Sequence, residues 1–434
     1  MTRTWPFAAI AATLTLAAAC NRPAPPSTPA RGRSCGVALS ADAGSDRDIA
    51  KLQQELREER APARAAEQLG HRFISRARLS NDSGFYKIAE QAAACLESYQ
   101  PDDPSALLLR GHILHQLHRF GEAEAIARRL VDARSFVLDF GLLGDALMEQ
   151  GRLAEAADAY QKMIDLKPFY QSYARAAHLR WLKGDLDGAV RMMGSAVKAA
   201  SPRDPESLAW GYARLAAYEL QRGRLDEAER TAAASLQTVP DYASALLVSG
   251  RIRLAQKKFP QAIELLERAA RLNPLPDYEW TLSDALRAAG RHDEADAAEQ
   301  LLRRNGAADD PRTFALYLST RTAARVPRAD DGQQAVELAR HELTVRADVF
   351  TLDALAWALV NTGEVHEASA LIERALAEGT ADARLFLHAS VIAAADGRPV
   401  EAARWAGKAR QLRFTLLPSE LGVLQGIAVT PPRA

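Results

Sequence analysis

Apolar and small residues at helical spacing predict two helices joined by a turn in residues 140–168. From Phe140 onward such residues fall at i, i+3, i+4 and i+7, which is one face of a helix, and a second helical run follows Gly151. Glycine readily takes the positive φ that ends a helix, and Pro168 ends the second run because proline has no backbone N–H to donate. The pattern therefore predicts a helix–turn–helix unit.

The same unit recurs along most of the chain and is marked by one alanine in its second helix. These alanines are Ala89, Ala123, Ala156, Ala189, Ala228, Ala262, Ala295, Ala335, Ala368 and Ala402. The steps between them are 34, 33, 33, 39, 34, 33, 40, 33 and 34 residues, so only two steps carry short insertions. A nearly constant period of this size is typical of a repeat architecture, not of a single globular core.

The unit resembles the tetratricopeptide repeat, whose signature is W-x2-L-G-x2-Y, then A-x3-F, then P. The matching residues of one unit are Leu143, Gly144, Leu147, Ala156, Tyr160 and Pro168. Turn glycines stand five residues before the marker alanine at Gly151, Gly184, Gly223, Gly290, Gly363 and Gly397. The resemblance covers residues 70–416 and implies an all-α, right-handed α-solenoid of about ten helix-turn-helix repeats.

The segments outside the array receive separate assignments. They are a signal peptide (1–19), a lipidated cysteine with a Pro-rich tether (20–45), an N-terminal capping helix region (46–69) and a C-terminal cap and tail (417–434). Caps are expected because a terminal repeat would otherwise expose its apolar face. For the C-terminal tail, a docking segment is the alternative to a cap.

The N-terminus predicts export from the cytosol. An apolar stretch of thirteen residues, 7–19, is shorter than the roughly 20 residues that a membrane-spanning helix needs, and it suits a signal peptide. The segment Leu16-Ala-Ala-Ala-Cys20 resembles a bacterial lipobox, in which the cysteine is lipidated, although Ala17 departs from the usual leucine. A soluble secreted protein and an uncleaved anchor are the alternatives. Asn21 favours the periplasmic side of the outer membrane.

Two further cysteines, Cys35 and Cys95, remain after lipidation of Cys20. An oxidising compartment would permit a disulfide between them, because Cys35 stands near the end of the tether and can reach the first repeat. Two free thiols are the alternative.

Composition and motifs give no sign of nucleic-acid binding, catalysis or a cofactor. Lys+Arg and Asp+Glu both number 55, whereas nucleic-acid binders carry a basic excess or stripe. His341-Glu342 and His366-Glu367 lack the second histidine of a zinc protease motif. His112, His115 and His118 drift around a helix at steps of three, so a polar surface is a better interpretation of them than a metal site.

The resemblance implies that the first helix of each unit lines a concave surface. The candidate partner-binding residues on it are His112, His115, Asp145, His178, Trp181, Trp210, Arg251, Trp280, Asp284, Arg287, Trp357 and Asn361. Aromatic groups beside mixed charges suit capture of protein or peptide segments. The alternative is that the tryptophans pack between neighbouring repeats. The carboxylate-clamp asparagine of chaperone-binding relatives is missing from this register, so a chaperone C-terminus is not an expected ligand.

These observations predict a non-enzymatic, lipid-anchored, periplasm-facing scaffold that binds protein partners in a cell-envelope assembly. The membrane would be contacted through the lipid only. A soluble secreted or cytosolic adaptor is the alternative, and an enzyme hidden in a degenerate repeat is a weaker one.

Overall fold

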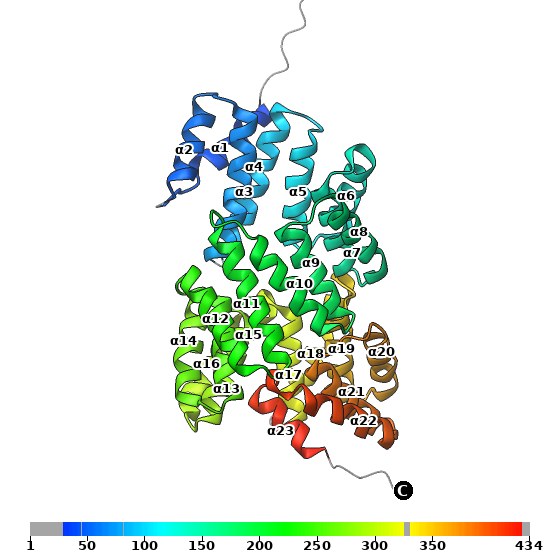
Figure 1. The fold of residues 1–434 in the computed structure, drawn as a ribbon. Coiled ribbons are helices and arrows are strands. Elements are labelled where there is room, and N and C mark those ends of the chain that lie inside the picture. The colour runs from blue at the N-terminus through cyan, green and yellow to red at the C-terminus, as the bar shows by residue number, and fades with distance from the viewer. Residues whose placement is uncertain (1–28, 45, 81, 325–329, 428–434) are drawn as a thin grey trace, which may run out of the picture.

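The structure, a computed structural model, describes residues 29–44, 46–80, 82–324 and 330–427. Over these residues the chain forms helices α1 to α23 and one 3₁₀ turn, η1, and none of them is in a β-strand (Figure 1). Within the same ranges, no helix combines the length and the apolar character that crossing a membrane requires. Cys20 and the expected signal peptide lie outside the described residues.

Ten antiparallel helix pairs follow one another along the chain. They are α3 (Pro62–Ser80) with α4 (Gly84–Tyr99), α5 (Pro104–Gln116) with α6 (Phe120–Arg134), α7 (Val137–Glu149) with α8 (Leu153–Leu166), α9 (Tyr170–Leu182) with α10 (Leu186–Ala199), α11 (Pro205–Gln221) with α12 (Leu225–Thr238), α13 (Ala243–Ala255) with α14 (Phe259–Leu272), α15 (Pro276–Ala288) with α16 (His292–Asp309), α17 (Pro311–Ala323) with α18 (Asp331–Val345), α19 (Val349–Thr362) with α20 (Val365–Ala377), and α21 (Ala383–Ala395) with α22 (Pro399–Gln411). The predicted all-α solenoid is confirmed.

Small residues let the two helices of each pair approach closely. The marker alanines all lie in the second helix, and nine of the ten are 0% exposed, with Ala402 at 5%. A Cβ on Gly144 would lie 2.3 Å from the Tyr160 ring, and a Cβ on Gly250 would lie 2.5 Å from Leu266 Cδ2. Any larger residue at these positions would separate the helices, which explains why alanine and glycine recur at them in successive repeats.

The turn inside each pair requires a left-handed residue. The six turn glycines predicted from the sequence all have positive φ, between +71° at Gly223 and +100° at Gly363. His118 and Lys257 occupy the same place in their repeats and also take φ of 59°. An L-residue is sterically strained in this conformation. Because His118 and Lys257 nevertheless adopt it, the geometry of the helix pair, and not the residue in the turn, sets the backbone there.

The N-terminal boundaries differ from the predicted ones. The range 20–45, expected to be a tether, contains helix α1 (Pro29–Ser40), and the first repeat begins at Pro62 instead of residue 70. Ala38 in α1 is fully buried, and the side chain of Gln53 in α2 (Arg47–Arg57) donates to the carbonyls of Ala38 and Ala41. The prolines around α1 made this segment look like a tether in the sequence, whereas its contacts with α2 and the first repeat hold it in a helix.

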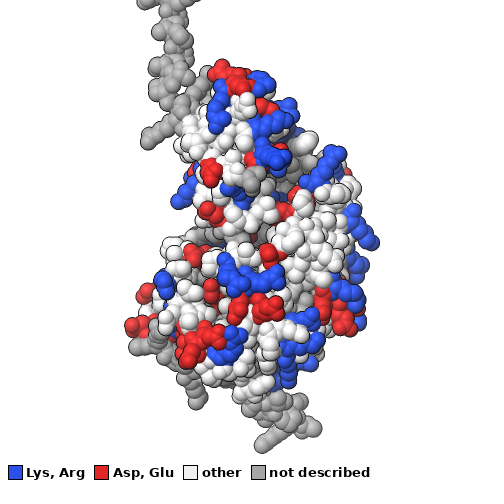
Figure 2. All heavy atoms as spheres, turned by 90° about the vertical axis from the view of Figure 1, so that its left-hand side faces the viewer, with Lys and Arg blue, Asp and Glu red and all other residues white. Residues whose placement is uncertain are grey.

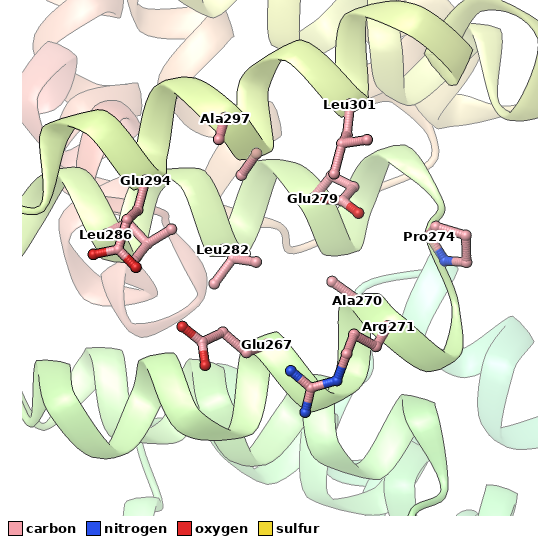
Figure 3. Close-up of a pocket in the computed structure, with 11 residues that line it drawn as sticks. Glu267, Ala270, Arg271, Pro274, Glu279, Leu282, Leu286, Glu294, Ala297 and Leu301 are labelled. Atoms are coloured by element: carbon pink, nitrogen blue, oxygen red, sulfur yellow. The ribbon is translucent and has the colours of Figure 1, made fainter.

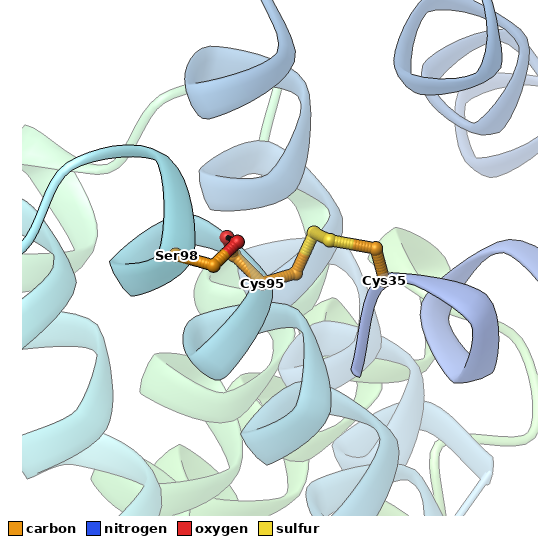
Figure 4. The surroundings of a disulfide bond; sticks show 3 residues. All are labelled: Cys35, Cys95 and Ser98. Carbon is orange, nitrogen blue, oxygen red and sulfur yellow. Dashed lines mark hydrogen bonds between the residues drawn. A yellow bond between two sulfur atoms is a disulfide. The ribbon is translucent and has the colours of Figure 1, made fainter. Parts of the chain in front are cut away.

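A disulfide joins α1 to the first repeat. Cys35 and Cys95 are bonded, with their Cα atoms 4.8 Å apart, and both side chains are buried (Figure 4). The bond closes a separation of 60 residues. Together with α2, which packs on α3, helix α1 covers the exposed end of the array.

The C-terminal end is covered by η1 (Arg413–Thr415) and α23 (Pro418–Gly426). Leu416, Leu417 and Leu424 are each at most 6% exposed. Helix α23 contacts α22, as a cap of the last repeat should, but it also contacts α15 and α17 from much earlier in the chain. Figure 1 shows α23 below α17, beside these earlier repeats.

The solenoid closes on itself between its middle and late repeats. The Lys183 ammonium pairs with Glu378 at 2.7 Å, and the hydroxyl of Thr380 donates to the Leu182 carbonyl, across 195 and 198 residues of sequence. A Cβ on Gly184 would lie 2.3 Å from the Gly379 carbonyl oxygen. Later repeats therefore pack directly against the turns of earlier ones.

Candidate functional site

A concave groove runs across the inner helices of the first half of the solenoid. It includes a cavity of about 450 Å³ formed by α3, α5, α7, α9 and α11 with one residue of α8. The lining residues that bear on its chemistry are Arg78, His115, Asp145, Tyr160, Tyr170, Arg175, His178, Glu206, Trp210 and Arg214. Four of them, His115, Asp145, His178 and Trp210, were expected from the sequence.

An ion pair organises the floor of this groove. Arg175 donates from Nε and Nη2 to the two carboxylate oxygens of Asp145, at 2.8 and 2.6 Å, and the Tyr160 hydroxyl donates to Asp145 at 2.8 Å. Burial disfavours the charged form of Asp145, but Arg175 and Tyr160 outweigh it and hold the pKa of Asp145 below its usual value. The floor is thus charged and internally paired, with its polar groups already fixed in place.

The groove histidines are held neutral. Burial, with the charge of Arg175 added, lowers the pKa of His112 to about 3, and burial with Arg214 lowers the pKa of His178 to about 3. Burial also lowers the pKa of His115. Neutral imidazoles offer one donor and one acceptor each, so near neutral pH they provide hydrogen bonds and aromatic surface but no charge.

Arg214 is the cation of the groove that lacks a carboxylate partner among the described residues. Its guanidinium lies over the rings of Trp181 and Tyr218, 5.5 and 5.7 Å from their centroids, and is 3.3 Å from His178 Nδ1. Its Nε has no hydrogen-bond partner within the described chain. The neighbouring Trp210 is 36% exposed. A cation without a carboxylate partner, beside a partly exposed tryptophan, can hold an acidic group attached to an apolar one.

Three candidate residues are not exposed on a groove, contrary to the prediction. Trp280 and Trp357 are 1% and 0% exposed, and Asp284 is 7% exposed. Trp280 packs edge-on against Tyr317, and the Trp357 indole N–H donates to Thr320 at 3.1 Å. These side chains pack between repeats, as the alternative interpretation of the tryptophans proposed. The physical reason is that closure of the solenoid leaves no open concave face there.

The remaining candidates bind groups of their own chain. Trp181 is half-buried and stacks on Phe350, with ring centroids 5.2 Å apart. Arg251 donates to Asp277, Arg287 donates to Asp296 and Glu299, and the Asn361 amide donates to the Trp357 carbonyl. Each of these contacts uses, within the chain, a side chain that the sequence pattern assigned to a partner.

Sequence reasoning missed the two arginines on which the groove depends. Arg175 stands three residues before the candidate His178, and Arg214 stands three residues before Ala217, which occupies the same register position in the next inner helix. Both arginines therefore lie about one helical turn away on the same face. A search that included this neighbouring register would have found both. The partnership of Arg175 with Asp145, 30 residues earlier, required the packing of α7 on α9.

The surface charge is mixed. Figure 2 shows basic and acidic side chains interspersed over the visible face, which is hollowed between its upper and lower parts. Over the described residues, no group of three His, Cys, Asp or Glu side chains is arranged to hold a metal ion. The arrangement supports binding through hydrogen bonds, aromatic contacts and local charge.

Tetratricopeptide-repeat family models match residues 219–279 in one case, and residues 74–137 and 141–170 in another. None of the curated protein sequences matches the chain.

Several solved structures are similar at low identity. The APC/C hetero-tetramer Cut9-Hcn1 is 14% identical with a TM-score of 0.46, over 84% of this chain and 62% of that chain, so this protein spans less than two thirds of it. The human IFIT1 dimer with PPP-AAAA is 13% identical with a TM-score of 0.47, over 88% and 94%. YrrB, described as a TPR protein with an unusual peptide-binding site, is 17% identical with a TM-score of 0.30, over 42% and 93%.

Proposed function

Because this chain is a tetratricopeptide-repeat protein, we propose that it is a non-enzymatic scaffold that holds protein partners in a cell-envelope assembly, anchored by a lipid on Cys20. Tetratricopeptide repeats are protein-interaction scaffolds, and their solenoids present long surfaces to partners. The observation that carries the proposal is the cavity of α3 to α11, where Arg214, which has no carboxylate partner among the described residues, and the 36%-exposed Trp210 lie beside the paired Arg175, Asp145 and Tyr160.

The groove suits an extended segment of a partner protein. Trp210 supplies apolar area, Arg214 supplies a cation, and the neutral histidines His115 and His178 supply hydrogen bonds. Aromatic and arginine side chains dominate the energetics of protein interfaces when they are buried by a partner. We therefore place the partner on the first half of the solenoid, with an acidic or carboxylate group at Arg214.

The disulfide supports the proposed compartment. Disulfides persist in oxidising environments such as the periplasm and are rare in the reducing cytosol. The Cys35–Cys95 bond thus favours the exported protein over the cytosolic adaptor, while a soluble secreted adaptor stays an alternative. The lipid and the periplasmic side of the outer membrane are proposed from the Leu16–Cys20 segment and Asn21.

Site-specific photocrosslinking in the native host tests the partner proposal. A photoreactive phenylalanine replaces Trp210 in the groove or, as a matched control, Val400, which is 79% exposed on α22. We expect a discrete protein adduct from position 210 that disappears when Arg214→Gln is added, and no such adduct from position 400. The same adducts from both positions would contradict binding in the groove.

Mass spectrometry of the mature N-terminus tests the anchor. We expect an acylated Cys20 in the membrane fraction and release of the protein into the soluble fraction in the Cys20→Ser variant. An unmodified Cys20 at the N-terminus would support the soluble secreted adaptor, and an intact Met1 would support the cytosolic one.

A further inference from the structure

A second cavity lies between repeats, away from the inner-helix groove. It measures about 470 Å³ and opens between the outer helices α14 and α16, with α15 as its floor (Figure 3). Its walls are largely aliphatic, formed by Leu282, Leu286, Leu301 and three alanines. Leu301 is 44% exposed, so part of this apolar wall is open to water.

One carboxylate stands inside this aliphatic cavity without a partner. Glu279 is 6% exposed, and its carboxylate, which lines the cavity, makes no hydrogen bond or ion pair to any described residue. Figure 3 shows its side chain beside Leu301, facing the space between the helices, with Glu267 and Arg271 on the opposite wall. Burial alone raises the pKa of Glu279 to about 7. Buried carboxylates are ordinarily paired, so an unpaired one marks a place where a counter-charge is missing.

The position of Glu279 is filled by an apolar side chain in other repeats. Glu279 is the fourth residue of inner helix α15. The fourth residue is aliphatic or aromatic in seven other inner helices: α5, α7, α9, α13, α17, α19 and α21. These residues are Leu107, Phe140, Tyr173, Leu246, Phe314, Leu352 and Phe386. Leu246 and Phe314 are 0% and 1% exposed, which shows the packing that this position normally supports. In α15 a charge replaces that packing, and a cavity accompanies it.

The nearby charges do not neutralise Glu279. Glu267 and Glu294 on the rim both pair with Arg291, at 3.5 and 2.5 Å. Arg271 lines the opening but is exposed and makes no ion pair with Glu279. One arginine, Arg291, is thus shared by the two rim glutamates, and no arginine among the described residues pairs with Glu279.

We infer that this cavity is a binding site for a basic side chain of a partner protein, a lysine or arginine whose aliphatic stem lies along Leu282, Leu286 and Leu301 and whose cationic end pairs with Glu279. Charge complementarity selects the cation, and the leucine walls select the stem, since long basic side chains pack their methylenes on apolar surface. The site is independent of the inner-helix groove, so the scaffold would hold a partner at a second surface.

Titration of the full chain with n-hexylammonium tests the inference, with 1-hexanol as a neutral control of the same length. Methyl-labelled Leu and Ala report the location by NMR. We expect saturable shifts at the methyls of Leu282, Leu286 and Ala298 with hexylammonium, at least tenfold weaker binding of hexanol, and at least tenfold weaker binding of hexylammonium to Glu279→Gln. Binding should strengthen from pH 6 to pH 8 as Glu279 ionises, and the rim variant Glu267→Gln should retain it.

Three results would overturn the inference. The first is equal affinity for hexylammonium and hexanol, which would make the site merely apolar. The second is unchanged hexylammonium binding in Glu279→Gln. The third is binding that appears only in Arg271→Met, which would mean that Arg271 closes the cavity in solution. None of these results bears on photocrosslinking at Trp210, so failure here and failure of the proposed function are separable.

Discussion

Asp284 on inner helix α15 accepts a hydrogen bond from the backbone N–H of Ser419 on the C-terminal helix α23, at 2.9 Å. These residues are 135 positions apart, and the contact places the end of the chain on the concave side of an earlier repeat. Burial raises the pKa of Asp284 to about 6, although the hydrogen bonds from Ser419 act in the opposite direction. The second half of the concave surface is therefore occupied by the protein itself, which leaves the first half for a partner.

The docking of α23 should depend on a buried ion pair. The Arg384 guanidinium donates to Glu420, which is 0% exposed and also accepts the backbone N–H of Leu417 at 2.8 Å. Glu420→Gln leaves Arg384 without its counter-charge, and we expect a cost of about 3–5 kcal/mol. Hydrogen exchange should accelerate over residues 416–426.

Glu401→Gln is the matched control for Glu420→Gln. Glu401 pairs with Arg398 and Arg404 at the surface of α22 and should contribute less than about 1 kcal/mol. Equal protection of residues 416–426 in wild type and Glu420→Gln would mean that leucine packing alone holds α23.

Closure of the solenoid should be sensitive to a methyl group on Gly184. Gly184 and Gly290 have nearly the same φ, +78° and +77°, but a Cβ on Gly184 would lie 2.3 Å from the Gly379 carbonyl whereas Gly290 faces open space. Both alanine variants incur the left-handed backbone strain of about 1–2 kcal/mol. Gly184→Ala should lose about 1–3 kcal/mol more through overpacking. Equal denaturation midpoints of the two variants would contradict direct packing of late repeats on this turn.

The turn at Lys257 should be improved by glycine. Lys257 has φ of 59° in a place where six other repeats have glycine, and its side chain is exposed. Lys257→Gly removes the strain of a left-handed L-residue, so we expect about 0.5–1 kcal/mol of added stability in urea denaturation. Lys257→Ala is the control, because alanine keeps a Cβ and with it the left-handed strain, so it should bring no comparable gain.

Glu279 should make stability depend on pH. Its pKa in the folded protein is about 7, above the ordinary 4.5, so the folded state binds the proton more tightly than the unfolded state. The folded protein therefore loses stability as pH rises from about 4.5 to about 7. Glu279→Gln should raise the free energy of unfolding at pH 8 by about 1–3 kcal/mol and leave it unchanged at pH 4, as denaturation at the two pH values would show. A pH-independent effect, or the same gain in Glu267→Gln, would contradict this origin.

The Cys35–Cys95 bond should hold α1 and α2 on the array. It closes a 60-residue loop, for which a stabilisation of about 2–4 kcal/mol is typical. Reduction, or the Cys35→Ser variant, should therefore expose residues before Pro62 to limited proteolysis. The repeats from α5 onward should keep their protection, because each contacts mainly its neighbours. Cleavage spread along the whole array would contradict a local role.

The sequence determined the repeat register, because that register depends on contacts within one helix pair. Gly144 and Ala156 are close in sequence and meet at one crossing, so their small size identifies the pair without knowledge of the rest of the fold. Positive φ at Gly151 follows from the same local geometry. Residues 70–416, about four fifths of the chain, could therefore be assigned to helix–turn–helix repeats from the pattern alone.

Only the tertiary structure decided which inner helix faces stay open to solvent, because the curvature that brings late repeats onto early ones is the sum of small rotations over many repeats. Trp181 stacks on Phe350, and Asp284 is covered by Ser419. Both contacts join segments that are far apart in the sequence, so a pattern within one repeat cannot predict them. Helix α1 likewise depends on a disulfide partner 60 residues away. That the carboxylate of Glu279 has no partner among the described residues, and that Arg214 has no carboxylate partner there, can be seen only in the packed structure, because both facts depend on the positions of all neighbouring side chains.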